Sequence, residues 1–343
     1  MRICILGAGW FGCFIADELI KKGFQVKIYE KEKDIFLNAS GNNQNRLHLG
    51  FHYPRSSTTR KLSKSGFKIF KKQLSKFSKK VKNNYYAVAK SPDSKIDFKE
   101  YCSVMRKEKY SFKNVNPDFF PYLKNLEGVI NCDEELILLE KVKKYYKKIL
   151  KKNILFNYEV KAIGKKQKKY IIDSKEYDMV INCTSLQFGE TKIKNILHEY
   201  CAIFLYRSVK KNHPAVTIMD GPFFTLYPWN GKRNYGLYSV EGSRILVGDN
   251  FRSLEKKVNN INKKLLQKIR IKIEKKFSYF YPSFKKEFKF VKFLNSYRII
   301  VKNKNDTRTC VVKEKNNFID IFSGKIDHIF YALKEVERCL KKF

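Results

Sequence analysis

The chain has 343 residues, which is more than one hydrophobic core usually serves and predicts two lobes. Hydrophobic residues make up 43% and charged residues 31%, with 28 Phe and 21 Tyr, a composition that excludes a disordered, collagen-like or low-complexity protein. The 72 basic and 33 acidic side chains give a net charge of +39, far above the roughly 2 to 8 of an ordinary small domain.

This charge has two interpretations. A basic surplus of this size is typical of proteins that bind nucleic acid or anionic membranes. Most of the cations are lysines, however, and they are scattered from Lys21 to Lys342 instead of gathering in one segment. We therefore favour a compositional bias. We expect weak, salt-sensitive attraction to polyanions and no specific nucleic-acid partner.

The eight cysteines are spread singly, with no C-x-x-C pair and no cysteine-histidine cluster at zinc spacing, so no metal site is predicted. They are typical of reduced thiols in a cytoplasmic protein. The apolar start at 3–16 is interrupted by three glycines, and no other stretch approaches the roughly 20 apolar residues of a membrane span. We therefore expect no transmembrane segment and a cytoplasmic location.

The first thirty positions predict a βαβ unit. Apolar runs at 2–6 and 25–30 are typical of strands, and residues 11–22 between them carry helical spacing. The turn at 7–12 fits the pattern G-x-G-x-x-G, and Glu30 ends the second strand at the acidic position of that pattern. Strand, turn, helix, strand and acid arrive in order, which makes a dinucleotide site the favoured interpretation.

Each residue of this pattern has a physical role. Gly7 and Gly9 let the backbone turn and approach a pyrophosphate, which the positive end of the helix holds. Gly12 lets the helix pack on the strand. Glu30 can accept both hydroxyls of an adenosine ribose and would repel a 2′-phosphate, so the site disfavours NADP.

The rest of the chain alternates between two kinds of pattern. Residues 133–152 carry helical spacing and are followed by strand-like runs at 154–160, 170–173 and 177–183, so the nucleotide lobe resumes there. Residues 200–301 are aromatic-rich and punctuated by glycine, which predicts an antiparallel sheet. Within it, apolar residues from Leu254 to Phe277 recur every three or four positions and predict one helical face. A strand, turn and helix end the chain at 318–340.

This order predicts an α/β fold in which a Rossmann-like nucleotide lobe is interleaved with a mixed antiparallel-sheet substrate lobe of α+β type. The predicted nucleotide lobe consists of residues 1–83, 127–195 and 302–343. The predicted substrate lobe consists of residues 84–126 and 196–301.

One segment resembles a known family. Residues 40–54, which read SGNNQNRLHLGFHYP, are similar without a gap to the S-G-x-N-x-x-x-[IL]-H-x-G-x-x-Y-P stretch of L-2-hydroxyglutarate oxidases. With the interleaved order, this match resembles the D-amino-acid-oxidase-like superfamily of FAD-dependent oxidoreductases, which includes glycine oxidase. The resemblance covers nearly the whole chain and implies that FAD is the cofactor.

The resemblance also implies positions for cofactor contacts. The segment at 40–54 would run past the flavin ring and over the pyrophosphate, the strand end at 178–185 would lie near the adenosine, and the loop at 323–328 would bond the flavin pyrimidine and ribityl chain. With the glycine pattern, the expected cofactor-binding residues are Gly7, Gly9, Trp10, Phe11, Gly12, Glu30, Ser40, Asn43, Arg46, Val160, Thr184, Gly324 and Lys325.

Three residues are the catalytic candidates. His48 and His52 stand four apart directly after the nucleotide unit, and a histidine can take a hydroxyl proton while hydride leaves for flavin N5. Both could instead brace the loop by hydrogen bonds. Arg298 lies in a Ser-Tyr-Arg segment that resembles the family's substrate-domain [AS]-x-R, and it could clamp a carboxylate or simply face solvent. Arg46 is a second anion-binding candidate, and Lys325 could stabilise a reduced anionic ring.

The expected activity is FAD-dependent oxidation of a CH–OH or CH–NH group in a small, carboxylate-bearing substrate, with oxygen, a quinone or another carrier as electron acceptor. Two different functions stay open. One is a flavoenzyme acting on a sugar nucleotide or modified base, since Tyr227 and Trp229 could stack such a ring. The second is a basic protein associated with nucleic acid or membrane, in which the Rossmann lobe is structural.

Overall fold

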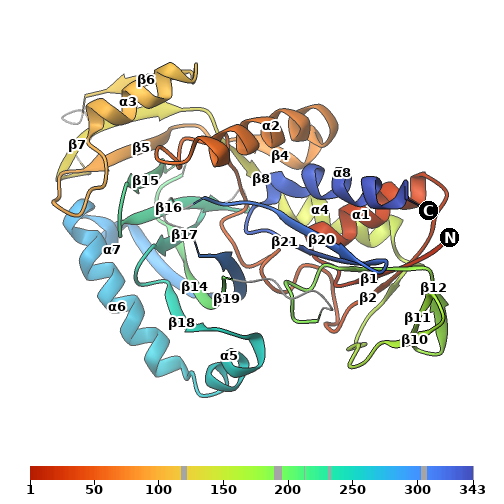
Figure 1. Ribbon diagram of the computed structural model, residues 1–343. Coiled ribbons are helices and arrows are strands. Elements are labelled where there is room, and N and C mark those ends of the chain that lie inside the picture. Colours follow the sequence, from red (N-terminus) through yellow and green to blue (C-terminus); the bar gives the residue numbers. More distant parts are fainter. Residues whose placement is uncertain (117–121, 189–194, 212, 231–232, 303–306, 343) are drawn as a thin grey trace.

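The structure, a computed structural model, describes residues 1–116, 122–188, 195–211, 213–230, 233–302 and 307–342 (Figure 1). Its helices are α1 (Trp10–Lys21), α2 (Ser57–Gln73), α3 (Phe98–Lys107), α4 (Leu139–Ile149), α5 (Phe251–Val258), α6 (Lys263–Phe280), α7 (Phe284–Glu287) and α8 (Ile329–Leu340), with short 3-10 turns η1 (Ser75–Phe77) and η3 (Ile326–His328).

The strands of the described residues form four sheets. A six-stranded sheet contains β1 (Arg2–Leu6), β2 (Gln25–Tyr29), β9 (Ile154–Leu155), β13 (Met179–Asn182), β20 (Val311–Lys315) and β21 (Phe318–Phe322). A nine-stranded sheet contains β5 (Asn84–Ala89), β6 (Phe112–Val115), β7 (Leu126–Cys132), β14 (Ile196–Ser208), β15 (Ala215–Met219), β16 (Phe224–Trp229), β17 (Asn234–Ser239), β18 (Arg244–Gly248) and β19 (Phe288–Val301). Two three-stranded sheets contain β3 (Arg46–Leu47), β4 (Ser78–Lys80) and β8 (Glu135–Ile137), and β10 (Gly164–Lys166), β11 (Lys169–Ile172) and β12 (Lys175–Tyr177).

The six-stranded sheet has the Rossmann-like arrangement that the sequence predicts. β1 lies at its centre, with β2 and β9 on one side and β13 and β21 on the other, all parallel, and β20 adds an antiparallel edge. The chain leaves β1 toward one side and later returns to the other, so the switch point of the sheet lies between β1 and β13. Ligands of such sheets bind outside the carboxyl ends of the strands at this point.

Both faces of this sheet are covered, which is why its strands are almost continuously apolar. Helices α1, α4 and α8 lie on one face, where Phe14, Tyr146 and Phe330 share a core with the Ile3 and Ile5 side chains of β1 (Figure 1). The small sheet of β10, β11 and β12 covers the other face. The sheet is therefore a buried layer, and its open end is left to form a site.

The nine-stranded sheet is mostly antiparallel, with one parallel pair between β5 and β15. Its apolar face packs on α6 and α7, as in the contact of Phe224 with Phe277, whose ring centroids lie 5.3 Å apart. On the side of β16 and β17 away from these helices, the sheet contacts the loop before β3, where Gln44 donates to the backbone oxygens of Thr225 and Gly236. This second face is therefore joined to the nucleotide-binding part of the chain.

Three sequence expectations need correction. Residues 133–152 are not one helix, because Glu135–Ile137 pairs with β3 and β4 as strand β8 before α4 begins. The predicted helical face from Leu254 to Phe277 is broken between α5 and α6. Asn262 Oδ1 accepts a 2.8 Å bond from Leu265 N and so starts α6 as a new helix. In this helix the Leu265 side chain is 41% exposed instead of lying on the buried face. β7 pairs with β5, so it belongs to the nine-stranded sheet although most of it was expected in the nucleotide lobe.

We keep the division into two lobes as a proposal, with the boundary moved behind β7. All eight cysteines are free. Within the described ranges, none of the helices is both long enough and apolar enough to cross a membrane.

Candidate functional site

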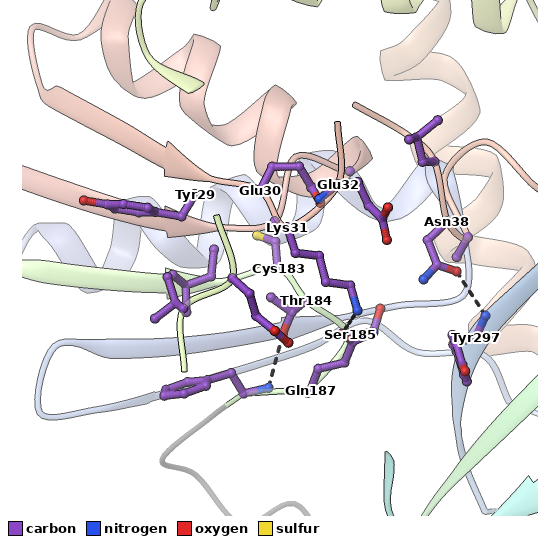
Figure 2. Close-up of a pocket in the computed structure, with 18 of the residues that line it drawn as sticks. Tyr29, Glu30, Lys31, Glu32, Asn38, Cys183, Thr184, Ser185, Gln187 and Tyr297 are labelled. Atoms are coloured by element: carbon purple, nitrogen blue, oxygen red, sulfur yellow. Dashed lines mark hydrogen bonds between the residues drawn. The ribbon is translucent and has the colours of Figure 1, made fainter. Parts of the chain in front are cut away.

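A cavity of about 470 Å³ lies at the carboxyl ends of β1 and β13, at the switch point of the six-stranded sheet. Its walls are the glycine turn after β1, the end of β2, the segment after β13, and parts of α5 and β19. Figure 2 labels wall residues from the end of β2, the segment after β13 and β19. Six of the predicted cofactor-binding residues line this cavity: Gly7, Gly9, Glu30, Ser40, Val160 and Thr184.

The glycine turn is shaped by close backbone contacts. Gly7 has φ +90°, and a Cβ there would lie 3.2 Å from the carbonyl oxygen of Cys183. A Cβ on Gly9 would lie 2.7 Å from Ser40 Oγ, and one on Gly12 only 2.0 Å from the carbonyl oxygen of Gly7. The first two glycines therefore keep the cavity floor open, and the third lets α1 pack on the turn, as expected for an anion site at a helix start.

Helix α1 begins with its amide groups directed at this floor. Gly9 is its N-cap and supplies no side chain, and Ser40 Oγ accepts a 2.9 Å bond from the Trp10 amide instead. The Trp10 ring is buried away from the cavity and stacks on Phe36 at 5.4 Å. Phe11 also packs against the core. Trp10 and Phe11 therefore do not line the cavity, and the Trp10 amide is already bonded to Ser40.

Glu30 links the end of β2 to the glycine turn. Its Oε2 accepts a 2.6 Å bond from the Ala8 amide, and its Oε1 accepts a 2.9 Å bond from the Glu32 amide. Burial raises the pKa of Glu30 above its usual value, although the two amide bonds oppose the shift. A carboxylate in this place can receive ribose hydroxyls.

The opposite wall is built by the segment after β13 and by α5. Thr184 Oγ1 donates to Asn182 Oδ1 at 2.6 Å, which holds the strand end in place. Lys31 donates to Gln187 Oε1 at 3.1 Å, a bond drawn in Figure 2, and its Nζ lies 5.6 Å from the centre of the Phe251 ring of α5. The cavity is thus closed by a helix that lies far away in the sequence.

A second group of side chains, which we call the polar cluster, lies beyond Ser40 along the same segment. Its members are Arg46, His48, His52, Tyr53, Tyr86, Glu134, Lys325, Asp327 and His328. The structure thus brings Arg46, His48, His52 and Lys325 together from the predicted residues.

Arg46 is buried among aromatic rings. Its guanidinium carbon lies 3.9 Å from the centre of the Tyr227 ring and 5.3 Å from that of Tyr86. Nη2 donates to Thr217 Oγ1 at 2.6 Å, and Nε lies 3.5 Å from Glu134 Oε2. The guanidinium is therefore held in place by the protein itself.

His48 and His52 are both poised as neutral bases. Burial lowers the pKa of His48 well below its usual value, and the charges of Lys325 and Arg46 lower it further. Burial likewise lowers the pKa of His52, with His48 and Arg46 acting in the same direction. The two rings lie 5.9 Å apart. Both imidazoles therefore carry a free nitrogen lone pair at neutral pH.

The terminal loop brings a cation into the cluster. Lys325 Nζ lies 3.3 Å from Tyr53 Oη and 3.5 Å from Asp327 Oδ1. Burial disfavours its ammonium form, but Asp327 and Tyr53 outweigh this effect and raise the pKa of Lys325, so the charge is retained. Nothing lies within 4 Å of a Cβ built on Gly324, which leaves this turn open.

The remaining candidates have partners inside the protein. Asn43 Nδ2 donates to the backbone oxygens of Ala39 and Ser40, so Asn43 braces the loop beside the cavity. Arg298 Nε donates to Glu199, the residue directly opposite on β14, and the Arg298 side chain is 32% exposed. Arg298 is thus tied to a buried carboxylate, and its guanidinium carbon lies 5.7 Å from the centre of the Tyr238 ring.

Sequence reasoning missed Glu134, Asp327 and His328. The buried carboxylate of Glu134 stands between Asp133 and Glu135, in the stretch 133–152 whose spacing predicts a helix. Asp327 and His328 could have been found, because they follow Lys325 in the loop assigned to the flavin. Glu134 could not, since only its contact with β3 and β5 distinguishes it from its neighbours.

The polar cluster leaves several buried polar atoms without a hydrogen-bond partner. They are Arg46 Nε, His48 Nδ1, His52 Nδ1, Asp327 Oδ1 and Oδ2, and His328 Nε2. Such atoms are costly unless a ligand or water satisfies them. These unpaired donors and acceptors lie beside a nucleotide-sized cavity. They could bond the polar edges of a flat ring system that is attached to a dinucleotide, and FAD has such a ring.

Comparisons with known proteins agree with this geometry. Residues 2–291 match the family described as FAD dependent oxidoreductase, DAO. The chain is 30% identical over 336 residues to the FAD-dependent monooxygenase FPY4 of Fusarium mangiferae, covering 97% of this chain and 89% of the relative. It is 24% identical over 376 residues to the FAD-dependent monooxygenase kojA of Aspergillus flavus, covering 98% and 85%.

Solved structures share the fold at low sequence identity. Glycine oxidase from Geobacillus kaustophilus has a TM-score of 0.72 at 11% identity, over 97% of this chain and 92% of that one. FAD-bound L-alpha-glycerophosphate oxidase from Mycoplasma pneumoniae has a TM-score of 0.75 at 16% identity, over 99% and 94%.

The chain therefore belongs to the DAO family of FAD-dependent oxidoreductases. It is a flavoenzyme with FAD as its cofactor. The sequence resemblance, the α/β fold with a Rossmann-like lobe and the cofactor are confirmed.

Proposed function

We propose that the protein oxidises a carbon bearing a hydroxyl or amino group in a small, carboxylate-bearing substrate. The observation that carries this proposal is the pair of half-buried, neutral histidines, His48 and His52, whose Nδ1 atoms are buried, beside two fixed cations, Arg46 and Lys325. Bound FAD supplies a two-electron acceptor for the hydride that leaves the substrate carbon, at N5 of its ring.

The chain's own residues have two tasks in this proposal. Gly7, Gly9 and the start of α1 would hold the pyrophosphate, and Glu30 would take the ribose hydroxyls. Ser40 braces the glycine turn through its bond from the Trp10 amide. Val160 and Thr184 line the same cavity and would lie beside the adenosine.

The second task is proton transfer. His48 accepts the hydroxyl or ammonium-derived proton of the substrate, so that a C=O or C=N bond forms as the C–H hydrogen leaves with its electron pair. His52 lies next to it as an alternative acceptor. Lys325 places a positive charge where a reduced ring would carry negative charge.

Arg298 and Arg46 are the candidates for the substrate carboxylate. Arg46 is enclosed by Tyr227, Tyr86, Thr217 and Glu134, so its charge orients groups nearby without offering a free bidentate edge. Arg298 bonds Glu199 through Nε, and its side chain is 32% exposed, whereas that of Arg46 is 2% exposed. We therefore propose Arg298 as the carboxylate clamp.

Monooxygenation is a second candidate. The relatives FPY4 and kojA are named FAD-dependent monooxygenases, and their similarity extends over nearly the whole chain. Action on a sugar nucleotide or modified base has weaker support. Tyr227 packs on Arg46, and Trp229 Nε1 donates to Asn43 at 3.1 Å, so both rings that could stack a base or sugar already have partners. A specific polyanion partner has only the net charge of +39 in its favour.

One experiment separates the two oxidative candidates. The FAD-loaded protein is mixed without oxygen with panels of 2-hydroxy acids and amino acids, and the flavin absorbance is followed. Bleaching by a panel member, with no label in the product when ¹⁸O₂ is later admitted, is expected. Label from ¹⁸O₂ in the product, with no anaerobic bleaching, would replace the proposal by monooxygenation.

The cytoplasmic location and the electron acceptor stay predictions.

A further inference from the structure

Glu134 is a fully buried carboxylate in the turn between β7 and β8. Its Oε1 accepts a 2.9 Å bond from the Leu49 amide, and its Oε2 accepts a 2.8 Å bond from Tyr86 Oη. Arg46 Nε lies 3.5 Å from Oε2, and His48 Nδ1 lies 3.8 Å from Oε1. One carboxylate therefore touches both the anion-binding candidate and the base candidate of this segment.

The position of Glu134 is fixed by the backbone. Strand β3 begins with Arg46 and pairs with β8, which begins one residue after Glu134. The Leu49 amide bond then ties the end of the His48 turn to the same carboxylate. A buried carboxylate is costly unless it is paired and hydrogen-bonded, and here the two bonds and Arg46 meet that need. The distance to His48 is therefore set by the fold and not by side-chain freedom.

His48 has one buried nitrogen and one open side. Its Nδ1 is buried without a hydrogen-bond partner, whereas its side chain as a whole is 20% exposed. A neutral imidazole carries one N–H, and this N–H is most stable where it faces a carboxylate. The 3.8 Å gap to Glu134 is roughly 1 Å longer than an N–H···O bond, and such contacts tighten when a site is filled.

We propose that Glu134 is a positioning residue that holds His48 as the Nδ1–H tautomer and thereby keeps Nε2 free to take the substrate proton. This proposal rests on the proposed function in one respect, that His48 is the base. A purely structural Glu134, which only braces Leu49 and Tyr86, would leave the tautomer of His48 undetermined.

The tautomer can be measured without any substrate. The FAD-loaded protein is labelled with ¹⁵N-histidine, and the ring nitrogens are observed by NMR at pH 7.5. The chain has only five histidines, so the His48 signals are assigned by their loss in a His48→Gln variant. We expect a protonated Nδ1 and an unprotonated Nε2. A protonated Nε2, or an even mixture of the two tautomers, would overturn the proposal.

A matched pair of variants tests the cause. Glu134→Gln keeps the size of the side chain but removes the negative charge that favours a proton on the ring nitrogen facing it, so the Nδ1–H signature should be lost. Glu135→Gln is the control, because Glu135 is also buried but pairs with Lys71 and Ser78 on the other side of β8. Glu135→Gln should leave the His48 signals unchanged.

The outcomes are distinguishable from those of the proposed function. Retention of the Nδ1–H signature in a folded, FAD-binding Glu134→Gln protein would contradict the proposal. If that variant does not fold, the tautomer in the unchanged chain decides by itself. With a substrate from the anaerobic panel, Glu134→Gln should also slow flavin bleaching on the order of tenfold or more, a part of what a general base contributes. A panel without any bleaching would contradict the proposed function and leave the tautomer result standing.

Discussion

Glu30 Oε2 lies 2.6 Å from the backbone nitrogen of Ala8, so the acid that ends β2 reaches into the glycine turn that follows β1. The two parts of the predicted dinucleotide site are thus joined by one hydrogen bond before any cofactor is considered. Glu32 adds a second amide to the same carboxylate. This arrangement holds the acid at the rim of the cavity, where an adenosine ribose would meet it.

Replacement of Glu30 should therefore weaken FAD binding. Glu30→Gln keeps the size of the side chain but removes the charge, and hydrogen bonds to a charged group are worth about 1.5–3 kcal/mol, so the Kd for FAD should rise about tenfold to a hundredfold. Titration of the apoprotein by flavin fluorescence measures this. Glu176→Gln, which alters only an exposed pair with Lys169, is the control. Equal FAD affinity of Glu30→Gln and the control would remove Glu30 from the site.

Two glycine substitutions should affect different properties: Gly12→Ala should lower the stability of the fold, and Gly324→Ala should weaken FAD binding only. A Cβ on Gly12 would lie 2.0 Å from the backbone oxygen of Gly7, so Gly12→Ala should destabilise the fold by roughly 1–3 kcal/mol or more. A Cβ on Gly324 would have no neighbouring atom within 4 Å, so Gly324→Ala should leave the melting temperature of the apoprotein unchanged. If the flavin lies against this loop, Gly324→Ala should still weaken FAD binding. A Gly12→Ala protein as stable as the parent would contradict the packing described.

Stability should fall between pH 6.5 and 5, because burial lowers the pKa of all five histidines. They are His48, His52, His198, His213 and His328. The unfolded chain takes up protons near pH 6.5 while the folded one does not, so lowering the pH favours unfolding. His328, whose pKa falls to about 4, alone accounts for about 2 kcal/mol at pH 5.

The measurement is the melting temperature at pH 7.5, 6.5 and 5.0 at constant ionic strength. Glu287, whose pKa lies at about 2, does not titrate in this window, and Glu30, whose pKa is raised by burial, would change the stability in the opposite direction, so a fall in stability belongs to the histidines. A His328→Gln variant should show a shallower decline than the parent. A melting temperature that is the same at pH 7.5 and pH 5.0 would mean that the histidines are not buried as described.

Variants of Arg298 and its partner Glu199 can tell whether Arg298 stabilises the fold, binds the substrate, or does both. Glu199 is fully buried, and it also bonds the partly exposed Arg244 at 3.2 Å. Arg298→Met should cost roughly 3 kcal/mol because it leaves this carboxylate underpaired, and adding Glu199→Met should restore much of the stability. If Arg298 also grips the substrate carboxylate, the double variant should be stable but show a raised KM. A double variant with an unchanged KM would make Arg298 purely structural.

The sequence predicts some parts of this molecule well because their signals are local. The turn at 7–12 and the runs around it suffice for β1, α1 and β2, since the glycine spacing and the apolar periods lie within thirty residues. The match at 40–54 likewise leads to His48 and Arg46. In both cases the residues that form the signal lie within one short stretch of the chain.

Other parts depend on contacts that the sequence does not display. The helical spacing from Leu254 to Phe277 continues across a break that Asn262 creates, because a new cap shifts the buried face from Leu265 to Leu266. The role of Glu134 depends on Leu49 and Tyr86, which are brought to it by pairing of β3 and β5 with β8 and β7. Such residues become candidates only when distant strands are placed side by side.

The most direct test of the account compares anaerobic flavin reduction in the FAD-loaded parent and in His48→Ala. We predict that at least one 2-hydroxy or amino acid bleaches the flavin of the parent, and that His48→Ala retains FAD but bleaches roughly a hundredfold or more slowly. Bleaching at the same rate in both proteins would contradict the role of His48, and no bleaching by any panel member would contradict the proposed oxidation itself.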